Sequence, residues 1–404
     1  MAEFHERRSN CISTYDSLAF DLLERGWAVV YLAEDSLNES EELALSNWED
    51  VFAAAFSLPT QEKVASGVYR TECGVSVGYR VDSEREFFES RIRSEGVPEP
   101  NFPQVADYTR TVQSLYSALN KVAQPAMTAI SESMGIDRQV FFDLTDLETD
   151  GVLAPITKTS PDGEAVETSS NLSSTLLRIC KYQDDVTTGT ASGKISQQST
   201  RNLWFGAHTD SSLLTLSLCS STPGLDIVDQ LENRWVAPEV MVRRQGEDEQ
   251  KGEPRGENSE FDSSHSSRHK VIIFVGEFLQ VISKHRYKAA VHRVRNLGDV
   301  GPFSPHVDHE TRGVIPITRI SCPYLIRGRH GAVFDIHNAE KYDHPGGEDA
   351  VSEENMPNLD GTSVKIMHKL LDLKRQRCFR ENGSAEGSDW VLSAYPVPPL
   401  PVEN

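Results

Sequence analysis

The residues best suited to chemistry are a histidine and an aspartate two positions apart in the segment WFGAHTDSSLLTLSL. On an extended backbone, side chains at positions i and i+2 point to the same face, so His208 and Asp210 can share one metal ion. A second imidazole from a distant strand would complete the facial triad of two histidines and one carboxylate, which leaves open positions on Fe(II). The sequence offers His292, in the strand-like segment YKAAVHRVR, as this third ligand.

Other histidine patterns compete with this interpretation. In a chain with 12 histidines, roughly one His-x-Asp match is expected by chance, and His306 with Asp308 is a second match. That pair lies in a segment rich in Gly and Pro, which offers a metal no rigid support, whereas His208 precedes a run of strong strand propensity. His265 and His269 have helical spacing, but they lie in the polar segment SSHSSRHK, and we interpret them as solvated.

The first 150 residues are expected to be mainly helical. Leucines at helical spacing predict a helix from Asp16 to Gly26, and a short buried strand follows at 27–32. Apolar residues at intervals of three and four predict two further helices, at 41–56 and at about 105–134.

The pattern changes after a linker or long loop at 151–174. Short strand candidates fill 175–335, among them TLLRICKY, SLLTLSL, GLDIVD, RWVAP, VIIFVG, FLQVIS, YKAAVHRVR, ITRISCPYL and GAVF. Such strands predict an antiparallel sandwich or barrel. Two polar insertions interrupt them: 243–268, too polar to fold and expected to be a disordered surface loop, and 297–316. The extension 336–404 is expected to contain a C-terminal helix in TSVKIMHKLLDLKRQRC.

Composition limits the classes of partner. The formal net charge of -21 argues against nucleic acid, because phosphate contacts need clustered Lys and Arg. The six cysteines are scattered without a Cys-x-x-Cys pair, which favours a reducing compartment. No run of about 18 apolar residues predicts a membrane span. We therefore expect a cytoplasmic protein, monomeric by default, that acts on a small-molecule substrate.

An ordered set of segments extends the metal motif into a family resemblance. LRICKY, HTDSSLLTL, PGLDIVDQLENRWVAP, VGEFLQVISKHRYKAAVHRV and RIS resemble, in this order, the catalytic domain of the isopenicillin-N-synthase-like family of 2-oxoglutarate- and Fe(II)-dependent dioxygenases. RGWAVVYL is similar to part of the family's N-terminal region. Asp210 and His292 are 82 positions apart, and subtracting the 26-residue insertion leaves 56, which is close to the family's usual separation.

The resemblance implies an α+β fold with a double-stranded β-helix (jelly-roll) core, a helical N-terminal dioxygenase region at 1–150 and a C-terminal helix. It implies Fe(II) held by His208, Asp210 and His292, with 2-oxoglutarate as cosubstrate and O2 as oxidant. No catalytic residue beyond the metal site is implied.

The resemblance also implies a cosubstrate site. The family's Arg-x-Ser element corresponds to Arg319 and Ser321, and a planar guanidinium suits a carboxylate because it can donate two parallel hydrogen bonds. Tyr182 corresponds to the tyrosine of the family's Asn-x-Tyr element, although Cys180 replaces the asparagine and a simple core role explains Tyr182 equally well. Arg-x-Ser by itself has little specificity, since Arg7 and Ser9 also match.

Substrate choice is less defined. Phe274 and Glu277 stand where many relatives have Asn and Asp. Phe87, Phe88 and Arg91, in SEREFFESR, are candidates to line the pocket, but a surface amphipathic helix would explain them as well.

The expected function is an oxygenase that hydroxylates or desaturates a small organic molecule and releases succinate and CO2. One alternative is a related iron oxidase that does not use 2-oxoglutarate. Another is a non-catalytic interaction protein on the same scaffold, which would bind a basic partner through the acidic insertion and the C-terminal helix.

Overall fold

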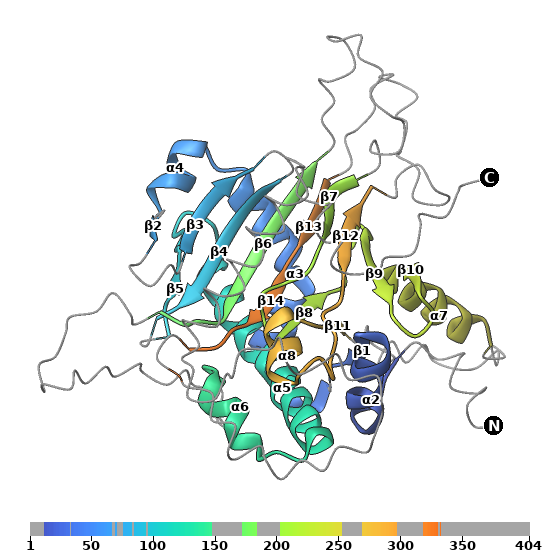
Figure 1. The fold of residues 1–404 in the computed structure, drawn as a ribbon. Helices are drawn as coiled ribbons and strands as arrows, with labels where there is room; N and C mark the ends of the chain where they lie inside the picture. Colours follow the sequence, from blue (N-terminus) through green and yellow to red (C-terminus); the bar gives the residue numbers. More distant parts are fainter. Residues whose placement is uncertain are drawn as a thin grey trace, which may run out of the picture.

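The molecule combines two antiparallel sheets with helices, as the α+β prediction requires (Figure 1). The computed structural model describes residues 12–32, 34–66, 69–70, 76–82, 85–93, 96–147, 172–183, 203–252, 269–296, 318–329 and 332. The larger sheet has ten strands, with eight in the order β1-β11-β8-β14-β6-β4-β3-β2, β13 paired to β6 and β5 paired to β4. The smaller sheet has the order β10-β9-β12-β7.

The helical elements are α2 (Tyr15–Arg25), η1 (Glu34–Ser36), α3 (Glu39–Phe56), α4 (Thr60–Ala65), α5 (Tyr108–Met134), α6 (Arg138–Leu144), α7 (Pro238–Gly252) and α8 (Glu277–Ile282). The first seven strands are β1 (Trp27–Tyr31), β2 (Tyr69–Arg70), β3 (Ser76–Val81), β4 (Glu86–Ile92), β5 (Pro98–Glu99), β6 (Leu176–Gln183) and β7 (Leu203–His208). The others are β8 (Leu214–Leu218), β9 (Leu225–Asp229), β10 (Arg234–Val236), β11 (Lys270–Val275), β12 (His292–Arg295), β13 (Thr318–Ser321) and β14 (Pro323–Ile326).

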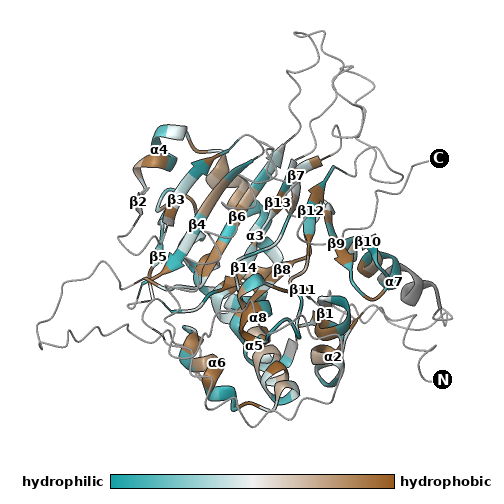
Figure 2. Cartoon of the chain, viewed as in Figure 1, coloured by the Kyte–Doolittle hydropathy of each residue, from teal (hydrophilic) through white to brown (hydrophobic). Residues whose placement is uncertain are grey.

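The two faces of the larger sheet have different partners. Leu177 and Ile179 of β6 are fully buried in one core together with residues of α3 and α5. The alternate positions Arg178, Cys180 and Tyr182 point to the opposite face, because successive side chains of a strand alternate. Hydrophobic and hydrophilic residues accordingly follow one another along β6 in Figure 2. On the face away from the helices, β1 and β11 add Trp27 and Phe274 to a second apolar cluster, whereas the part formed by β4 and β6 carries charged residues such as Glu89 and Arg91.

The helices and the strand expected in the first third are confirmed within a few residues. In α2, Thr14 and Ser17 form a capping box, and Gly26 ends the helix in the left-handed conformation with φ of 79°. The helix α5 continues through Pro125.

The helices α2, α3, α4, α5 and α6 fill most of the structured part of the region expected to be mainly helical, which also supplies β2, β3, β4 and β5. SEREFFESR, for which an amphipathic helix was one alternative, forms most of the strand β4. Two predictions of secondary structure were wrong. The run FLQVIS lies in α8, because periodicity cannot separate a strand from a helix in so short an apolar run. The insertion expected to be disordered begins inside α7, which extends to Gly252.

Several predictions fall on residues that the structure does not describe. These are the rest of that insertion, the insertion 297–316, most of the linker, the C-terminal extension with its expected helix, and His306 with Asp308. Within the described ranges, no helix has both the length and the apolar character needed to cross a membrane.

The edge of the larger sheet is formed by the first strand of the chain. The strand β1 pairs antiparallel with β11 over five positions, from Trp27 opposite Phe274 to Tyr31 opposite Lys270. Thus β11, which leads toward α8, lies between β1 and β8 in the sheet interior.

We predict that Phe88→Ala destabilises the fold by about 3–5 kcal/mol, as expected for removing a large buried aromatic side chain. The Phe88 side chain is fully buried, and its ring centroid lies 4.7 Å from Phe56, 4.9 Å from Phe102 and 5.4 Å from Tyr79. Urea unfolding followed by circular dichroism measures the loss. Val81→Ala in β3, where the side chain is 61% exposed, is the control and should change stability by at most about 0.5 kcal/mol. Equal effects of the two variants would contradict the core assignment.

Candidate metal centre

His208, Asp210 and His292 meet at one point of the structure. One ligand atom from each lies within 4.8 Å of the other two, and Nε2 of His292 is 3.8 Å from Oδ2 of Asp210. Asp210 and His292 are buried, and His208 is half-buried. Two imidazole nitrogens and a carboxylate oxygen in this arrangement are the donor set of a facial triad.

Strand pairing brings the two histidines together. In the smaller sheet β12 pairs with β7, and His292 lies directly opposite His208. Directly opposite residues of an antiparallel pair project to the same face. The ring centroids are accordingly 4.1 Å apart.

Backbone carbonyl groups fix which nitrogen of each imidazole faces the metal position. Nδ1 of His208 is 2.9 Å from the carbonyl oxygen of Gly206, and Nδ1 of His292 is 3.1 Å from that of Ala290. A carbonyl oxygen only accepts hydrogen bonds, so each Nδ1 must carry the proton and each Nε2 keeps a free lone pair.

Asp210 is held by the loop that follows β7. Its backbone carbonyl accepts from the Glu277 N–H at 2.8 Å, and its Oδ2 accepts from the Thr215 hydroxyl at 2.8 Å. The N-terminus of α8 also contacts this loop through Gly276, whose N–H donates to the Leu213 carbonyl at 2.9 Å. A side chain at Gly276 would overlap the Ser212 backbone, so only glycine permits this approach.

The electrostatic surroundings favour the protonation states that a metal needs. Burial, and then the nearby His292 and Arg85 side chains, lower the pKa of His208 well below its usual value, so this imidazole is neutral. Burial raises the pKa of Asp210, but the two neighbouring histidines and Arg178 outweigh burial and lower it to about 2. A neutral imidazole and an ionised carboxylate are ready to bind a cation.

The two departures from the family pattern both contact the centre. The Phe274 ring lies 4.6 Å from the His292 ring, so it packs where many relatives have a polar side chain. Glu277 accepts a hydrogen bond from the Thr209 hydroxyl at 2.6 Å. Both residues therefore support the ligands and do not disrupt them.

The predicted cosubstrate residues share one sheet face. Arg319 is paired with Tyr182, and Ser321 with Cys180, between β13 and β6. Burial, and then Cys180, raise the pKa of Tyr182 to about 12, so its hydroxyl is a hydrogen-bond donor.

Arg319 has a partner that the sequence did not reveal. Its two terminal nitrogens donate to both carboxylate oxygens of Glu239, each at 3.1 Å, and both residues are buried. Its Nε atom is buried and has no acceptor among the described residues. A side chain at Gly224 would crowd the Arg319 stem and overlap the Arg295 carbonyl, so glycine makes room for the arginine. The terminal nitrogens are thus taken by Glu239 and the Thr222 carbonyl, and Nε is the donor without a partner among the described residues.

Arg85 is a second cation near Tyr182, and no sequence motif identified it. Its Nη1 donates to the Tyr182 hydroxyl at 3.4 Å. Its guanidinium carbon lies 3.8 Å from the centroid of the Phe205 ring, which packs edge-on against His208 at 4.5 Å. Only the three-dimensional arrangement could identify it, because it precedes β4, far from the metal motif in the chain.

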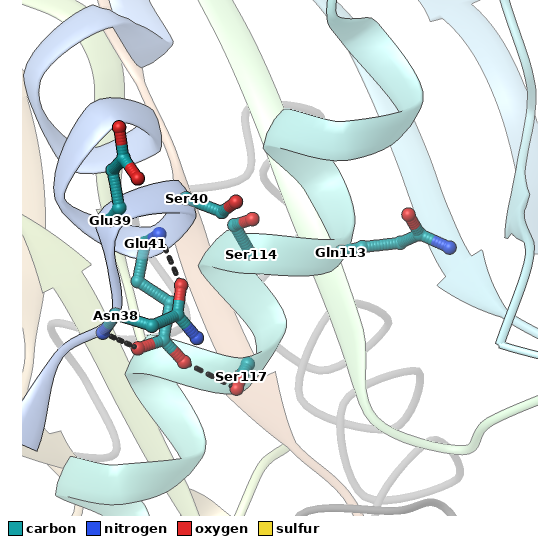
Figure 3. Close-up of a pocket in the computed structure, with 7 residues that line it drawn as sticks. All are labelled: Asn38, Glu39, Ser40, Glu41, Gln113, Ser114 and Ser117. Carbon is teal, nitrogen blue, oxygen red and sulfur yellow. Dashed lines mark hydrogen bonds between the residues drawn. The ribbon is translucent and has the colours of Figure 1, made fainter.

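A surface hollow between the start of α3 and α5 does not belong to this centre (Figure 3). Its one buried charge, Glu41, accepts from the Asn38 N–H at 2.8 Å, from the Ser117 hydroxyl at 2.6 Å and from Lys121 at 2.6 Å. The carboxylate is therefore satisfied as a helix cap and ion pair, and it offers a ligand no unused group.

We predict that Gly276→Ala weakens metal binding at least tenfold, because the new methyl group displaces the loop that carries Asp210. Anaerobic Fe(II) titration of the purified protein measures the affinity. Gly96→Ala is the matched control: its φ of 79° strains an alanine, but no atom crowds the added carbon and it lies outside the metal site. Equal iron affinity in the Gly276→Ala variant and the wild type would show that this close approach does not position Asp210.

Comparison with known proteins gives a structural likeness only. No family model matches the chain, and no curated protein matches it by sequence. A crystal structure of full-length thymine 7-hydroxylase from Neurospora crassa, in complex with alpha-ketoglutarate and 5-formyluracil, has a TM-score of 0.53 and 16% identity, covering 88% of this chain and 89% of that one. A structure of a 2OG-Fe(II) oxygenase family protein from Caulobacter crescentus has a TM-score of 0.50 and 17% identity, covering 89% and 93%. The chain therefore shares the fold of solved 2-oxoglutarate and Fe(II) oxygenases.

Proposed function

We propose that this protein is a 2-oxoglutarate- and Fe(II)-dependent oxygenase that hydroxylates or desaturates a small organic molecule. Its two sheets would form the double-stranded β-helix of such enzymes. The observation that carries the proposal is the convergence of His208, Asp210 and His292, with both Nδ1 atoms bonded to backbone carbonyls.

His208, Asp210 and His292 would hold Fe(II) through two neutral nitrogens and one anionic oxygen. When bound, iron would couple the decarboxylation of 2-oxoglutarate to oxidation of the substrate. In a hydroxylation, 2-oxoglutarate, O2 and a substrate C–H bond would give succinate, CO2 and an alcohol. Thr215 and Glu277 keep the carboxylate ligand in place, and the Phe274 ring packs against His292.

The far carboxylate of 2-oxoglutarate would bind on the face shared by Arg319, Ser321 and Tyr182. The unused Nε of Arg319 and the Tyr182 hydroxyl are donors that fit a carboxylate. The Arg85 guanidinium, which donates a hydrogen bond to the Tyr182 hydroxyl, brings a second positive charge to this face. The likeness to an oxygenase solved with alpha-ketoglutarate supports this ligand.

The monomeric state and the cytoplasmic location stay predictions, and sedimentation velocity tests the former. An iron oxidase without 2-oxoglutarate, or a non-catalytic protein on this scaffold, would differ in measurable ways. The first would consume O2 without forming succinate, and the second would not bind iron.

We predict that calorimetry without oxygen detects 2-oxoglutarate binding to the iron-loaded protein. His208→Ala should abolish this binding, because a metal ligand is lost. Arg319→Gln should weaken it at least tenfold and leave iron affinity unchanged, since a charge-assisted hydrogen bond is removed.

Arg110→Gln serves as the charge control, because Arg110 is exposed on α5 and pairs with Asp107. It should bind 2-oxoglutarate like the wild type. If the wild type binds iron but no 2-oxoglutarate, the oxidase becomes the better interpretation; if it binds neither, the proposal fails.

A further inference from the structure

A group of arginines lies around β4 and β6 on the face of the larger sheet away from α3 and α5, close to Asp210 but distinct from the cosubstrate residues. Arg178 comes from β6, Arg91 from β4, and Arg327 follows β14. Arg91 has a structural role, because it is buried and donates hydrogen bonds to the carbonyls of Ser173 and Ser174. Arg178 and Arg327 have fewer partners, and no function assigned above uses them.

Strand register explains why these side chains meet. In the pairing of β4 with β6, Glu89 lies directly opposite Arg178, and Phe87 opposite Cys180. Arg178 therefore shares its face with Tyr182, four residues further along β6. At about 3.3 Å per residue the two positions are about 13 Å apart along the strand. The strand thus keeps Arg178 apart from the Tyr182 hydroxyl on the same face.

The two arginines have incomplete protein partners. Arg178 donates through Nη2 to Glu89 at 2.7 Å, and Arg327 donates through Nη2 to the Ser211 hydroxyl at 2.7 Å. Both Nε atoms are buried and have no acceptor among the described residues. A guanidinium has five N–H donors, so each group has capacity for a further anion.

Charge in this region is unbalanced. Burial raises the pKa of Glu89, but Arg178, Arg91 and Arg327 outweigh it and lower that pKa, so all three cations act on one carboxylate. Burial, followed by Arg178 and Arg91, lowers the pKa of Arg327 to about 9, which still leaves it charged at neutral pH. Two other carboxylates lie nearby. Asp210 would be a ligand of a bound metal, and Asp146 accepts a hydrogen bond from the Thr175 N–H and interacts with the charge of Arg91. Arg178 and Arg327 together therefore exceed Glu89 by one positive charge.

We propose, resting on the function proposed above, that the substrate carries a carboxylate and that Arg178 and Arg327 bind it beside the metal. A single planar anion matches one surplus positive charge and two guanidinium groups with unused donors. Ser211, which holds Arg327, directly follows Asp210 in the chain, so the bound carboxylate would lie next to the metal ligands. Substrates would then be oxidised at a carbon close to the acid group.

The test uses the full chain, loaded with Fe(II) and 2-oxoglutarate without oxygen. Acetate, benzoate and phenylacetate are titrated by calorimetry, each against its neutral amide, and phenyl phosphate is titrated as a dianion. We expect at least one acid to bind tenfold or more tightly than its amide and more tightly than phenyl phosphate. Equal binding of acids and amides, or preference for the phosphate ester, would overturn the proposal.

Variants separate ligand binding from a purely structural role. Arg178→Gln and Arg327→Gln should each weaken acid binding at least tenfold without changing 2-oxoglutarate affinity, and Arg178→Lys, which keeps the charge, should retain part of it. Glu89→Gln should strengthen acid binding, because it removes the carboxylate that competes with the ligand for Arg178. If the ion pair had only a structural role, this variant would not bind acids more tightly. Arg110→Gln is again the charge control.

The outcomes also distinguish this proposal from the function on which it rests. If the wild type fails to bind 2-oxoglutarate but still binds acids in a manner that depends on Arg178 and Arg327, the oxygenase function fails and the anion site stands. If 2-oxoglutarate binds normally and both Gln variants bind acids like the wild type, the anion site is wrong and the oxygenase function is unaffected.

Discussion

The pairing of His208 with His292 across β7 and β12 is the constraint on which the site depends. Because side chains alternate along a strand, a slip of one residue would send one imidazole to the opposite face and separate the ligands. The register is held on the other side of β12 as well, where His292 lies opposite Ile227 of β9. The position of Asp210 then depends on the loop after β7, which is held by hydrogen bonds from Gly276 and Glu277 at the start of α8. The metal position is therefore a product of sheet register.

The larger sheet separates packing from chemistry by using its two faces differently. Its apolar face meets α3 and α5 in the main hydrophobic core. The opposite face carries charged residues that are buried, and a buried charge is costly unless it is paired. Pairs such as Arg319 with Glu239 and Arg178 with Glu89 meet this requirement. The buried polar part of this face, formed by β4, β6 and β13, can thus keep charged groups in a setting of low dielectric constant.

The sequence predicted that His208, Asp210 and His292 come together, because His-x-Asp on a strand is a local pattern and the third residue followed in the family's order. It could not reveal Glu239 as the partner of Arg319, since 80 positions separate them and only the packing of α7 brings them together. The role of β4 was also hidden, because EFFESR has no helical or strand period strong enough to decide. The strand places Phe88 in the core and Arg91 on the other face, a difference that depends on register with β6. Long-range pairing, and not local propensity, determined what was missed.

The strand β1 forms one edge of the larger sheet and covers β11. A strand at a sheet edge exposes unpaired N–H and C=O groups that can template association with another chain. The strand β11 reads KVIIFV and is almost wholly buried and apolar, so it would be hazardous in that position. The strand β1 covers it, and Ser13, just before α2, donates from its N–H to the Val29 carbonyl on β1 at 2.7 Å. The start of the described chain therefore acts as a protective border, and removing it would turn the apolar strand β11 into an open edge.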